Sequence, residues 1–233
     1  MLFPLFDLNP HRRWPIVTML LVAINFGVTA WTWSQPERHQ NRIAIEYGFV
    51  PARLTHVGQG QPVAGTLTAV DPRTGQVVPI ARMKLSTDPA RVYLTFLTTM
   101  FLHGGWMHLL MNMWMLWVFG NNIEDRLGHF VYLGFYLAGG IIATLAFWAS
   151  APEAFTPVIG ASGAVAAVLG GYAVTFPTAK IRTLLFLVIF FTIIDMPALV
   201  WLGIWFLTQL YSGLMGLWGA PLAPVAFWAH IGG

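Results

Sequence analysis

The feature that most restricts the fold of this chain is a series of apolar segments, each long enough to cross a lipid bilayer. The first covers residues 15–33, the second 94–119 and the third 130–150. A hydrocarbon core of ~30 Å needs about 20 apolar residues in a helix. Only 9% of the residues are charged, whereas a soluble domain usually has about a quarter. The sequence therefore predicts an all-α polytopic membrane protein.

Three further apolar segments lie in the C-terminal half. The fourth contains Ser162, the fifth covers residues 198–217, and Pro221 opens the sixth. From Pro221 to Gly233 a helix reaches only ~20 Å, which is short of the ~30 Å core. We therefore expect a six-helix bundle with a truncated sixth helix, which continues in the natural protein. A shorter apolar run at residues 183–194 cannot cross, and we interpret it as a re-entrant segment whose backbone is shielded by protein.

The long polar region of the chain, residues 34–93, lies between the first two spans. Two short runs of β-type residues, 66–70 and 76–80, flank the turn sequence Asp-Pro-Arg-Thr-Gly at residues 71–75. This pattern is typical of a β-hairpin. We expect a single domain over residues 1–233, with an enlarged outer loop that carries this hairpin.

The charged loops predict how the chain is oriented in the membrane. If the spans alternate, the basic residues of the short loops all fall on one side: Arg12, Arg13, Arg126, Lys180 and Arg182. Short loops rich in Lys and Arg stay in the cytoplasm. The N-terminus is therefore expected inside, and the loop at residues 34–93 outside.

Composition narrows the classes of function. The net charge of +3 is small and the basic residues are scattered, so the sequence does not favour nucleic-acid binding. The chain has no cysteine, which excludes disulfides and thiolate zinc sites. It contains no nucleotide, flavin or phosphate motif, so we predict no cofactor and no metal.

Three polar side chains from distant spans are predicted to lie at one depth. The second, fourth and sixth spans all enter from the outer face. At 1.5 Å per residue, His108, Ser162 and His230 lie roughly 7–15 Å below that face. Ionisable groups at such a depth are costly and usually functional. We therefore expect these residues to share one site in the outer leaflet.

Ser162 has the surroundings that a nucleophile needs. It lies between Gly160 and Gly163 at the start of its span, and glycine lets another backbone approach the hydroxyl closely. A helix start also offers unpaired N–H groups to a developing negative charge. Such a serine acts as a nucleophile where a base and oxyanion donors meet it. Taken alone, however, the small residues favour simple helix packing.

Donors and a base are predicted at the same depth. His108 and Asn112 are four residues apart and share one face of their helix, and both can donate hydrogen bonds to an oxyanion. His230 can take the proton of Ser162 as a general base at neutral pH. For His108, Asn112 and His230, the alternative role is packing between membrane helices. No Asp or Glu lies at this depth on the three spans, so Ser162 and His230 would work as a dyad.

Four motifs connect these residues: His103-Gly-Gly-Trp-Met-His108 with Asn112, Glu124-Asp-Arg-Leu-Gly128, Gly160-Ala-Ser-Gly163 and Ala229-His-Ile-Gly-Gly233. With them, the chain from about residue 94 to its end resembles the rhomboid family of intramembrane serine proteases. The resemblance implies that Ser162 is the nucleophile and His230 the base. It also implies an oxyanion site of His108, Asn112 and backbone around the serine, in which we include Gly160.

The resemblance also implies a structural loop and reveals a departure. In the family, Glu124, Arg126 and Gly128 belong to a structural loop rather than to the chemistry. Some members place an aromatic residue one turn after the serine, where it stacks on the base, but this chain has Ala166 there. The sequence therefore identifies no stacking partner for His230.

The leading hypothesis is an intramembrane serine endopeptidase that cleaves peptide bonds in or near transmembrane segments of membrane proteins. Its partners would be such substrates and the lipid bilayer. We expect it in the bacterial cytoplasmic membrane, with the active site open toward the outer face. One alternative is a catalytically silent rhomboid-like protein that binds transmembrane segments. Another is a transporter or a metal site built on His103, His108 and His230, against which the lack of a carboxylate at this depth argues.

Overall fold

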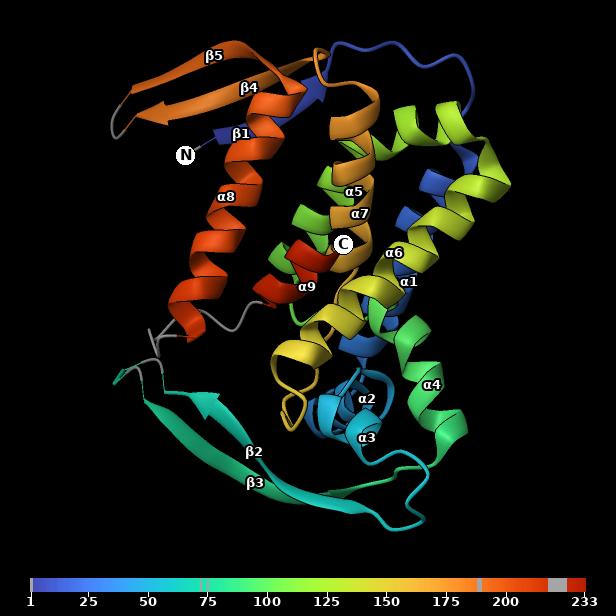
Figure 1. The fold of residues 1–233 in the computed structure, drawn as a ribbon, viewed down its shortest axis with the longest axis vertical. Helices are drawn as coiled ribbons and strands as arrows, with labels where there is room; N and C mark the ends of the chain where they lie inside the picture. Colours follow the sequence, from blue (N-terminus) through green and yellow to red (C-terminus); the bar gives the residue numbers. More distant parts are fainter. Residues whose placement is uncertain (1, 72, 75, 188–189, 218–225) are drawn as a thin grey trace.

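The computed structural model describes residues 2–71, 73–74, 76–187, 190–217 and 226–233. Its helices lie between a three-stranded sheet at one end and a two-stranded sheet at the other (Figure 1). The elements in chain order are β1 (Leu2–Asp7), α1 (Ile16–Ser34), α2 (Glu37–Tyr47), α3 (Pro51–Thr55), β2 (Val63–Val70), β3 (Val77–Leu85), α4 (Pro89–Thr98), the 3-10 helix η1 (Thr99–Phe101), α5 (Trp106–Leu127), α6 (His129–Ser150), α7 (Ser162–Thr175), β4 (Lys180–Leu187), β5 (Phe190–Pro197), α8 (Ala198–Leu217) and α9 (Phe227–Gly232).

Three helices in the described part of the chain are long and apolar enough to cross a membrane, namely α1, α6 and most of α8. They correspond to the first, third and fifth predicted spans. Large apolar side chains such as Leu20, Leu145 and Leu207 are exposed on them, as expected for a surface that faces lipid. The protein is therefore a mostly helical membrane protein. The count of six spans stays a prediction, because residues 218–225, where the sixth was expected to begin, lie outside the described residues.

The second predicted span is wrong in its limits. The sequence predicts one helix over residues 94–119 and a break at Gly120, but the structure has α4 and η1, a non-helical linker, and then an unbroken α5. Gly120 is a close-packing position, because a Cβ there would lie 2.5 Å from Tyr132 Oη and 3.2 Å from Thr18 Oγ1. The helix ends instead at Leu127 and is followed by Gly128, whose φ of 77° favours glycine.

Glu124, near the end of α5, joins three helices. Its carboxylate accepts hydrogen bonds of 2.8 Å from the N–H groups of Val17 and Thr18 and from the Thr18 hydroxyl. His129 Nδ1 donates to it at 2.6 Å. No side chain from within α1 caps the start of that helix, so Glu124 caps it from outside. The loop that the resemblance described as structural is in fact the last turn of α5.

Helix α7 lies at the centre of the bundle, where small residues allow close packing. A Cβ on Gly163 would lie 2.5 Å from the Cβ of Ala143 in α6. Gly139 of α6 likewise lies against Ala167. Contacts between small residues are the usual way in which membrane helices approach one another. The small residues near Ser162 therefore do serve helix packing, as the alternative interpretation expects.

The apolar run at residues 183–194 is not re-entrant. Its described residues, 183–187 and 190–194, lie in β4 and β5, which pair antiparallel with Lys180 opposite Pro197. Strand β1 adds to the other edge of β4, with Asp7 opposite Ile181. Strand pairing satisfies the backbone groups that a re-entrant segment would have to shield, and the many β-branched and aromatic residues of the run favour it.

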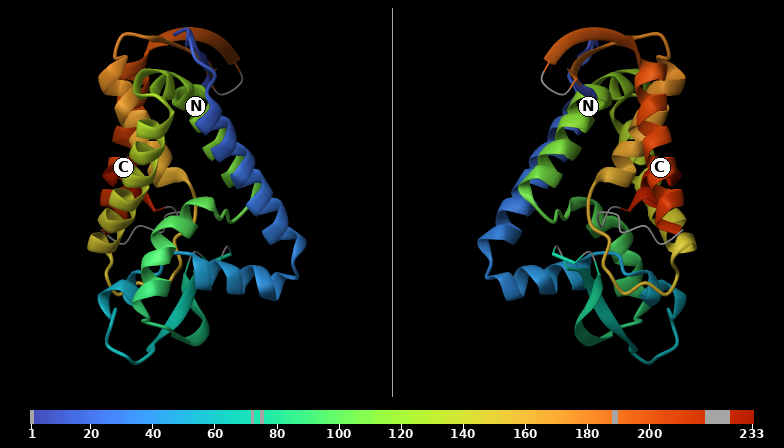
Figure 2. Two further views of the ribbon diagram at one scale, coloured as in Figure 1. Left: turned by 90° about the vertical axis from the view of Figure 1, so that its right-hand side faces the viewer. Right: turned by 90° about the vertical axis from the view of Figure 1, so that its left-hand side faces the viewer.

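Residues 34–93 form α2, α3 and the strands β2 and β3, followed by the first half of α4. β2 and β3 pair antiparallel along their length, and Figure 2 shows them at the end of the molecule opposite β1, β4 and β5. Phe49 and Val158 exchange backbone hydrogen bonds of 3.0 and 2.8 Å, and Gly65 lies against the ring of Phe155. The region therefore supports the segment that leads into α7.

Candidate active site

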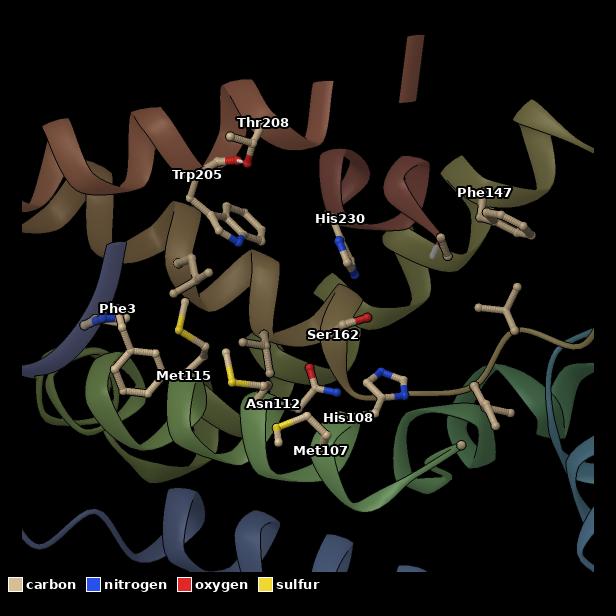
Figure 3. Close-up of a pocket in the computed structure, with 18 of the residues that line it drawn as sticks. Phe3, Met107, His108, Asn112, Met115, Phe147, Ser162, Trp205, Thr208 and His230 are labelled. Carbon is tan, nitrogen blue, oxygen red and sulfur yellow. Dashed lines mark hydrogen bonds between the residues drawn. The ribbon is translucent and has the colours of Figure 1, made fainter. Parts of the chain in front are cut away.

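A cavity of about 1100 Å³ lies beside the start of α7. Side chains from α5, α7, α8 and α9 line it, together with residues of β1 and of the segment before α7. Ser162, His230, His108 and Asn112 are among them, and Figure 3 shows their polar ends directed into one space. Among the described lining residues, the two histidines are the only ionisable side chains, and most of the others are apolar. The structure thus brings together the side chains that the sequence placed at one depth.

Hydrogen bonds hold the segment that precedes Ser162. The Gly160 N–H donates to the carbonyl of Thr99 at 2.9 Å, and the Thr99 hydroxyl donates to the carbonyl of Val158. Ser162 is the first residue of α7, and no side chain caps this helix. The first N–H groups of α7 therefore have no partner within the helix. They lie next to the serine hydroxyl, where an oxyanion could accept from them.

Gly160 provides space rather than a donor. Because its N–H is bonded to Thr99, it is not free for a ligand, which corrects the expectation that Gly160 belongs to the oxyanion donors. Its φ of 134° is one that residues with a side chain rarely adopt. A Cβ here would lie 2.8 Å from Cε1 and Nε2 of His108. Glycine at this position therefore allows the His108 ring to lie against the backbone before Ser162.

His108 and Asn112 project from consecutive turns of α5 into the cavity (Figure 3). Asn112 is 6% exposed, and its Nδ2 has no hydrogen-bond partner among the described residues. A buried amide donor without a partner costs about 1–3 kcal/mol. Such a cost is typical of a group whose partner is a ligand.

His103 lies behind His108, with 5.2 Å between the ring centroids. It is 4% exposed, and it is not among the residues described as lining the cavity. In the described part of the chain, no three His, Asp or Glu side chains are grouped as metal ligands. His103, His108 and His230 are therefore not arranged as the metal site that the alternative hypothesis of a transporter or metal site requires.

His230 is held from two sides. Its helix α9 packs against α6 and α7, where Gly232 lies against Ala146 and Gly233 against the carbonyl of Gly163. On the other side, the His230 Nδ1 bonds to Gln209 Oε1 of α8 at 2.8 Å. Ser162 and His230 make no hydrogen bond to each other in the part of the chain that the structure describes. Both face the cavity, so a ligand placed between them would contact both.

Two residues of α8 at this site were missed by the sequence analysis. Gln209 bonds to His230, and the Trp205 ring lies 6.0 Å from the imidazole, centroid to centroid, at an interplanar angle of 30°. A signal for Gln209 was present, because a polar amide inside an apolar span is costly and is usually functional. Trp205 gave no such signal, since tryptophan is common in membrane helices.

Comparisons with known proteins agree with these motifs. The family described as "Rhomboid domain" matches residues 90–233. Presenilin-associated rhomboid-like protein A, mitochondrial, of Danio rerio is 35% identical over 94 residues, which are 40% of this chain and 24% of that protein. Rhomboid protein 1, mitochondrial, of Saccharomyces cerevisiae is 32% identical over 108 residues, 45% of this chain and 31% of that protein. Rhomboid-like protein 11, chloroplastic, of Arabidopsis thaliana is 40% identical over 70 residues, 30% of this chain and 25% of that protein.

The chain thus matches between a quarter and a third of the length of these curated relatives. Their names place them in mitochondria and chloroplasts, so the expectations of a bacterial type and of a bacterial cytoplasmic membrane gain no support from them. No solved structure matches the chain. Because the family match covers more than half of the sequence, the chain belongs to the rhomboid family.

Proposed function

We propose that this protein is an intramembrane serine endopeptidase that cleaves peptide bonds in or near transmembrane segments of membrane proteins. The observation that carries the proposal is the unpartnered amide of Asn112, buried at the wall of the cavity that also contains Ser162, His108 and His230. Membership of the rhomboid family supports the same chemistry. A silent binding protein would have no need of a donor, a hydroxyl and an imidazole at one point.

The proposed reaction proceeds in two halves. Ser162 Oγ attacks the scissile carbonyl carbon while His230 Nε2 takes the hydroxyl proton. The negative charge moves to the carbonyl oxygen, which accepts hydrogen bonds from Asn112 Nδ2, an N–H of the His108 ring and the N–H of Ser162. The carbon–nitrogen bond then breaks as His230 protonates the leaving amine, and the acyl chain stays on Ser162. In the second half His230 deprotonates a water molecule, which attacks the ester carbon. The bond to Ser162 Oγ then breaks as His230 returns the proton to that oxygen, and the carboxylic acid is released.

The lining of the cavity favours an apolar substrate. Met107, Met111 and Met115 recur every four residues along α5 and line the cavity, as does Trp205 of α8. Figure 3 shows Met115 on the side of α5 that faces Trp205. Methionine side chains adapt to irregular apolar partners. A transmembrane segment would fit this surface once its helix is locally opened, because a carbonyl bonded within a helix is not free for attack.

We propose that the site opens toward the outer face, with the N-terminus in the cytoplasm, in the membrane of a bacterium.

Cleavage of a single-span substrate by the purified protein in detergent tests the proposal. The wild-type protein should produce two fragments, and Ser162→Ala should produce none, because Ser162 is the only serine among the described residues that line the cavity and the chain has no cysteine. Cleavage that survives in Ser162→Ala would contradict the assignment of Ser162. A wild-type protein that can be crosslinked to the substrate but does not cut it would support the silent binding protein instead.

Replacement of Gly160 by alanine should reduce cleavage by about 100-fold, because misplacing one catalytic group by about 1 Å has this effect. The added Cβ would lie 2.8 Å from the His108 ring and would force it away from the oxyanion. The rate should be measured beside Gly134→Ala on α6, where nothing lies within 4 Å of the added Cβ. Gly134→Ala should cleave at the wild-type rate, and equal rates for the two variants would contradict the role of Gly160.

A further inference from the structure

Helix α8 holds a directed series of hydrogen bonds that ends at His230. The Thr208 hydroxyl donates to the Trp205 carbonyl at 2.6 Å, so its oxygen remains available as an acceptor. The Gln209 Nε2 donates to the Thr208 hydroxyl oxygen at 3.4 Å. With its nitrogen on Thr208, the amide presents Oε1 to the His230 Nδ1 at 2.8 Å.

This direction determines which nitrogen of His230 carries the proton. An amide oxygen only accepts, so Nδ1 must be the donor. A neutral imidazole has one N–H, which leaves Nε2 with a free lone pair. Gln209 is not among the residues described as lining the cavity, and it therefore acts on the chemistry only through His230.

We propose that Gln209 is a positioning residue that holds His230 in the Nδ1–H tautomer, with Nε2 available to accept the proton of Ser162. The consequence for catalysis rests on the proposed function. Trp205 limits rotation of the same ring from its side. These two contacts from α8 supply the orientation that an aromatic residue after the serine supplies in some relatives, where this chain has Ala166.

An amide suits this position better than a carboxylate would. Among the described residues, no acidic side chain lines the cavity, and a carboxylate near its apolar wall would carry a large desolvation cost. An amide oxygen fixes the tautomer through its dipole without adding a charge. Its partial negative charge also faces the imidazolium that forms as Ser162 attacks, and so it stabilises that state.

The tautomer can be measured directly, without reference to activity. We would label the full-length protein with ¹⁵N-histidine in detergent micelles and assign His230 by comparison with His230→Ala. Correlations between the ring carbons' protons and the two nitrogens distinguish the Nδ1–H from the Nε2–H form. The wild-type protein should show Nδ1–H, and Gln209→Leu should show the Nε2–H form or a mixture. An unchanged tautomer in Gln209→Leu would overturn the proposal.

Kinetics give a second measurement on the same variants. Gln209→Leu should lower kcat by about 10–100-fold, which is the effect of removing the hydrogen-bond partner that orients a metal-ligating histidine, with KM within about twofold of wild type. Gln209→Glu keeps an oxygen that accepts from His230 Nδ1, so its kcat should be much closer to the wild-type value than that of Gln209→Leu. The acid limb of its pH–rate profile should move to higher pH. The matched control is Gln59→Leu, because Gln59 Oε1 also pairs with a histidine, His56, at 3.2 Å. That pair is outside the cavity, and its loss should change neither measurement.

The two proposals fail in different ways. Suppose that the wild-type protein does not cleave and that the Nδ1–H tautomer of His230 is present in it but absent from Gln209→Leu. Gln209 then positions His230, and the proposed protease function is wrong. If the protein cleaves through Ser162 while Gln209→Leu keeps both its tautomer and its kcat, the function stands and the role of Gln209 is wrong. A fall in kcat equal for Gln209→Leu and Gln209→Glu, with the tautomer unchanged, would indicate a packing role only and would also overturn the proposal.

Discussion

Replacement of Asn112 by leucine is expected to lower kcat by about 10²–10³-fold, which is the usual effect of losing one oxyanion donor. The same change should leave the protein as stable as the wild type or more stable. The reason is that Asn112 Nδ2 is buried without a partner among the described residues, so its removal gives up no hydrogen bond of the resting protein. Leucine has a similar volume and carries no polar group that would need one. Loss of activity and gain of stability should therefore occur together, as at other sites where function requires an unfavourable group.

Asn122 on the same helix provides the opposite case. Its Nδ2 donates to Asp7 and, at 3.1 Å, to Asn121, and Asp7 holds β1 to the bundle through Tyr172 at 2.8 Å. Asn122→Leu removes a donor from a partly buried carboxylate and should lower the free energy of unfolding by about 1–3 kcal/mol. It should leave kcat near the wild-type value, because Asn122 does not line the cavity.

Cleavage rates and melting temperatures in detergent would check both variants. We expect Asn112→Leu to cleave slowly and to keep the wild-type melting temperature or exceed it. Asn122→Leu should cleave at nearly the wild-type rate and melt at a lower temperature. A melting temperature that falls by the same amount in both variants would mean that Asn112 is a structural residue. A normal rate in Asn112→Leu would remove it from the oxyanion site.

The site was predictable where polar residues interrupt an apolar span. Ser162, His108 and His230 satisfied that rule and were placed at one depth by counting residues from the outer face. Gln209 satisfies the same rule, but its contact with His230 depends on how α8 packs against α9. Packing between helices is not encoded in the spacing within one of them. The stacking position of Trp205 was unpredictable for the same reason.

The fold was predictable where an element is defined by its own sequence. The bounds of α1, α6 and α8 follow from length and hydropathy alone. The strands β4 and β5 did not, because a short apolar run is compatible with a buried segment as well as with a strand. The third strand of their sheet is β1, which pairs with β4 from the N-terminus of the chain, and pairing over that separation leaves no local signal. Gly160 shows the same limit at the scale of one residue. The family resemblance led us to include Gly160 in the oxyanion site, but the bond from its N–H to Thr99 became visible only when α7 and η1 were placed together.

Replacement of Glu124 by alanine is expected to lower the free energy of unfolding by about 3 kcal/mol or more, because two buried bonds from backbone N–H groups to a carboxylate are lost and each such bond contributes about 1.5–3 kcal/mol. Glu124 is 1% exposed and accepts four hydrogen bonds, two of them from the N–H groups of Val17 and Thr18. Alanine would leave both N–H groups unpaired at the start of α1 and would remove a negative charge from the positive end of that helix. Since no side chain of α1 caps its own start, nothing nearby in the helix replaces the carboxylate.

The neighbouring residue gives a matched control. Asp125 also accepts from backbone N–H groups, those of Arg12 and Arg13, at 3.2 and 3.0 Å, but these bonds are exposed to solvent. Asp125→Ala should therefore cost less than about 1 kcal/mol, since water replaces the lost acceptor. Glu124→Gln, which keeps one acceptor oxygen, should fall between the two alanine variants. Thermal unfolding in detergent would rank the three, and an equal loss of stability in Glu124→Ala and Asp125→Ala would show that the charge of this loop matters rather than the buried cap. The result has a bearing on the active site, because α5 carries Glu124 at one end and His108 and Asn112 at the other. A cap that fixes α1 against α5 also fixes the helix from which both proposed oxyanion donors project.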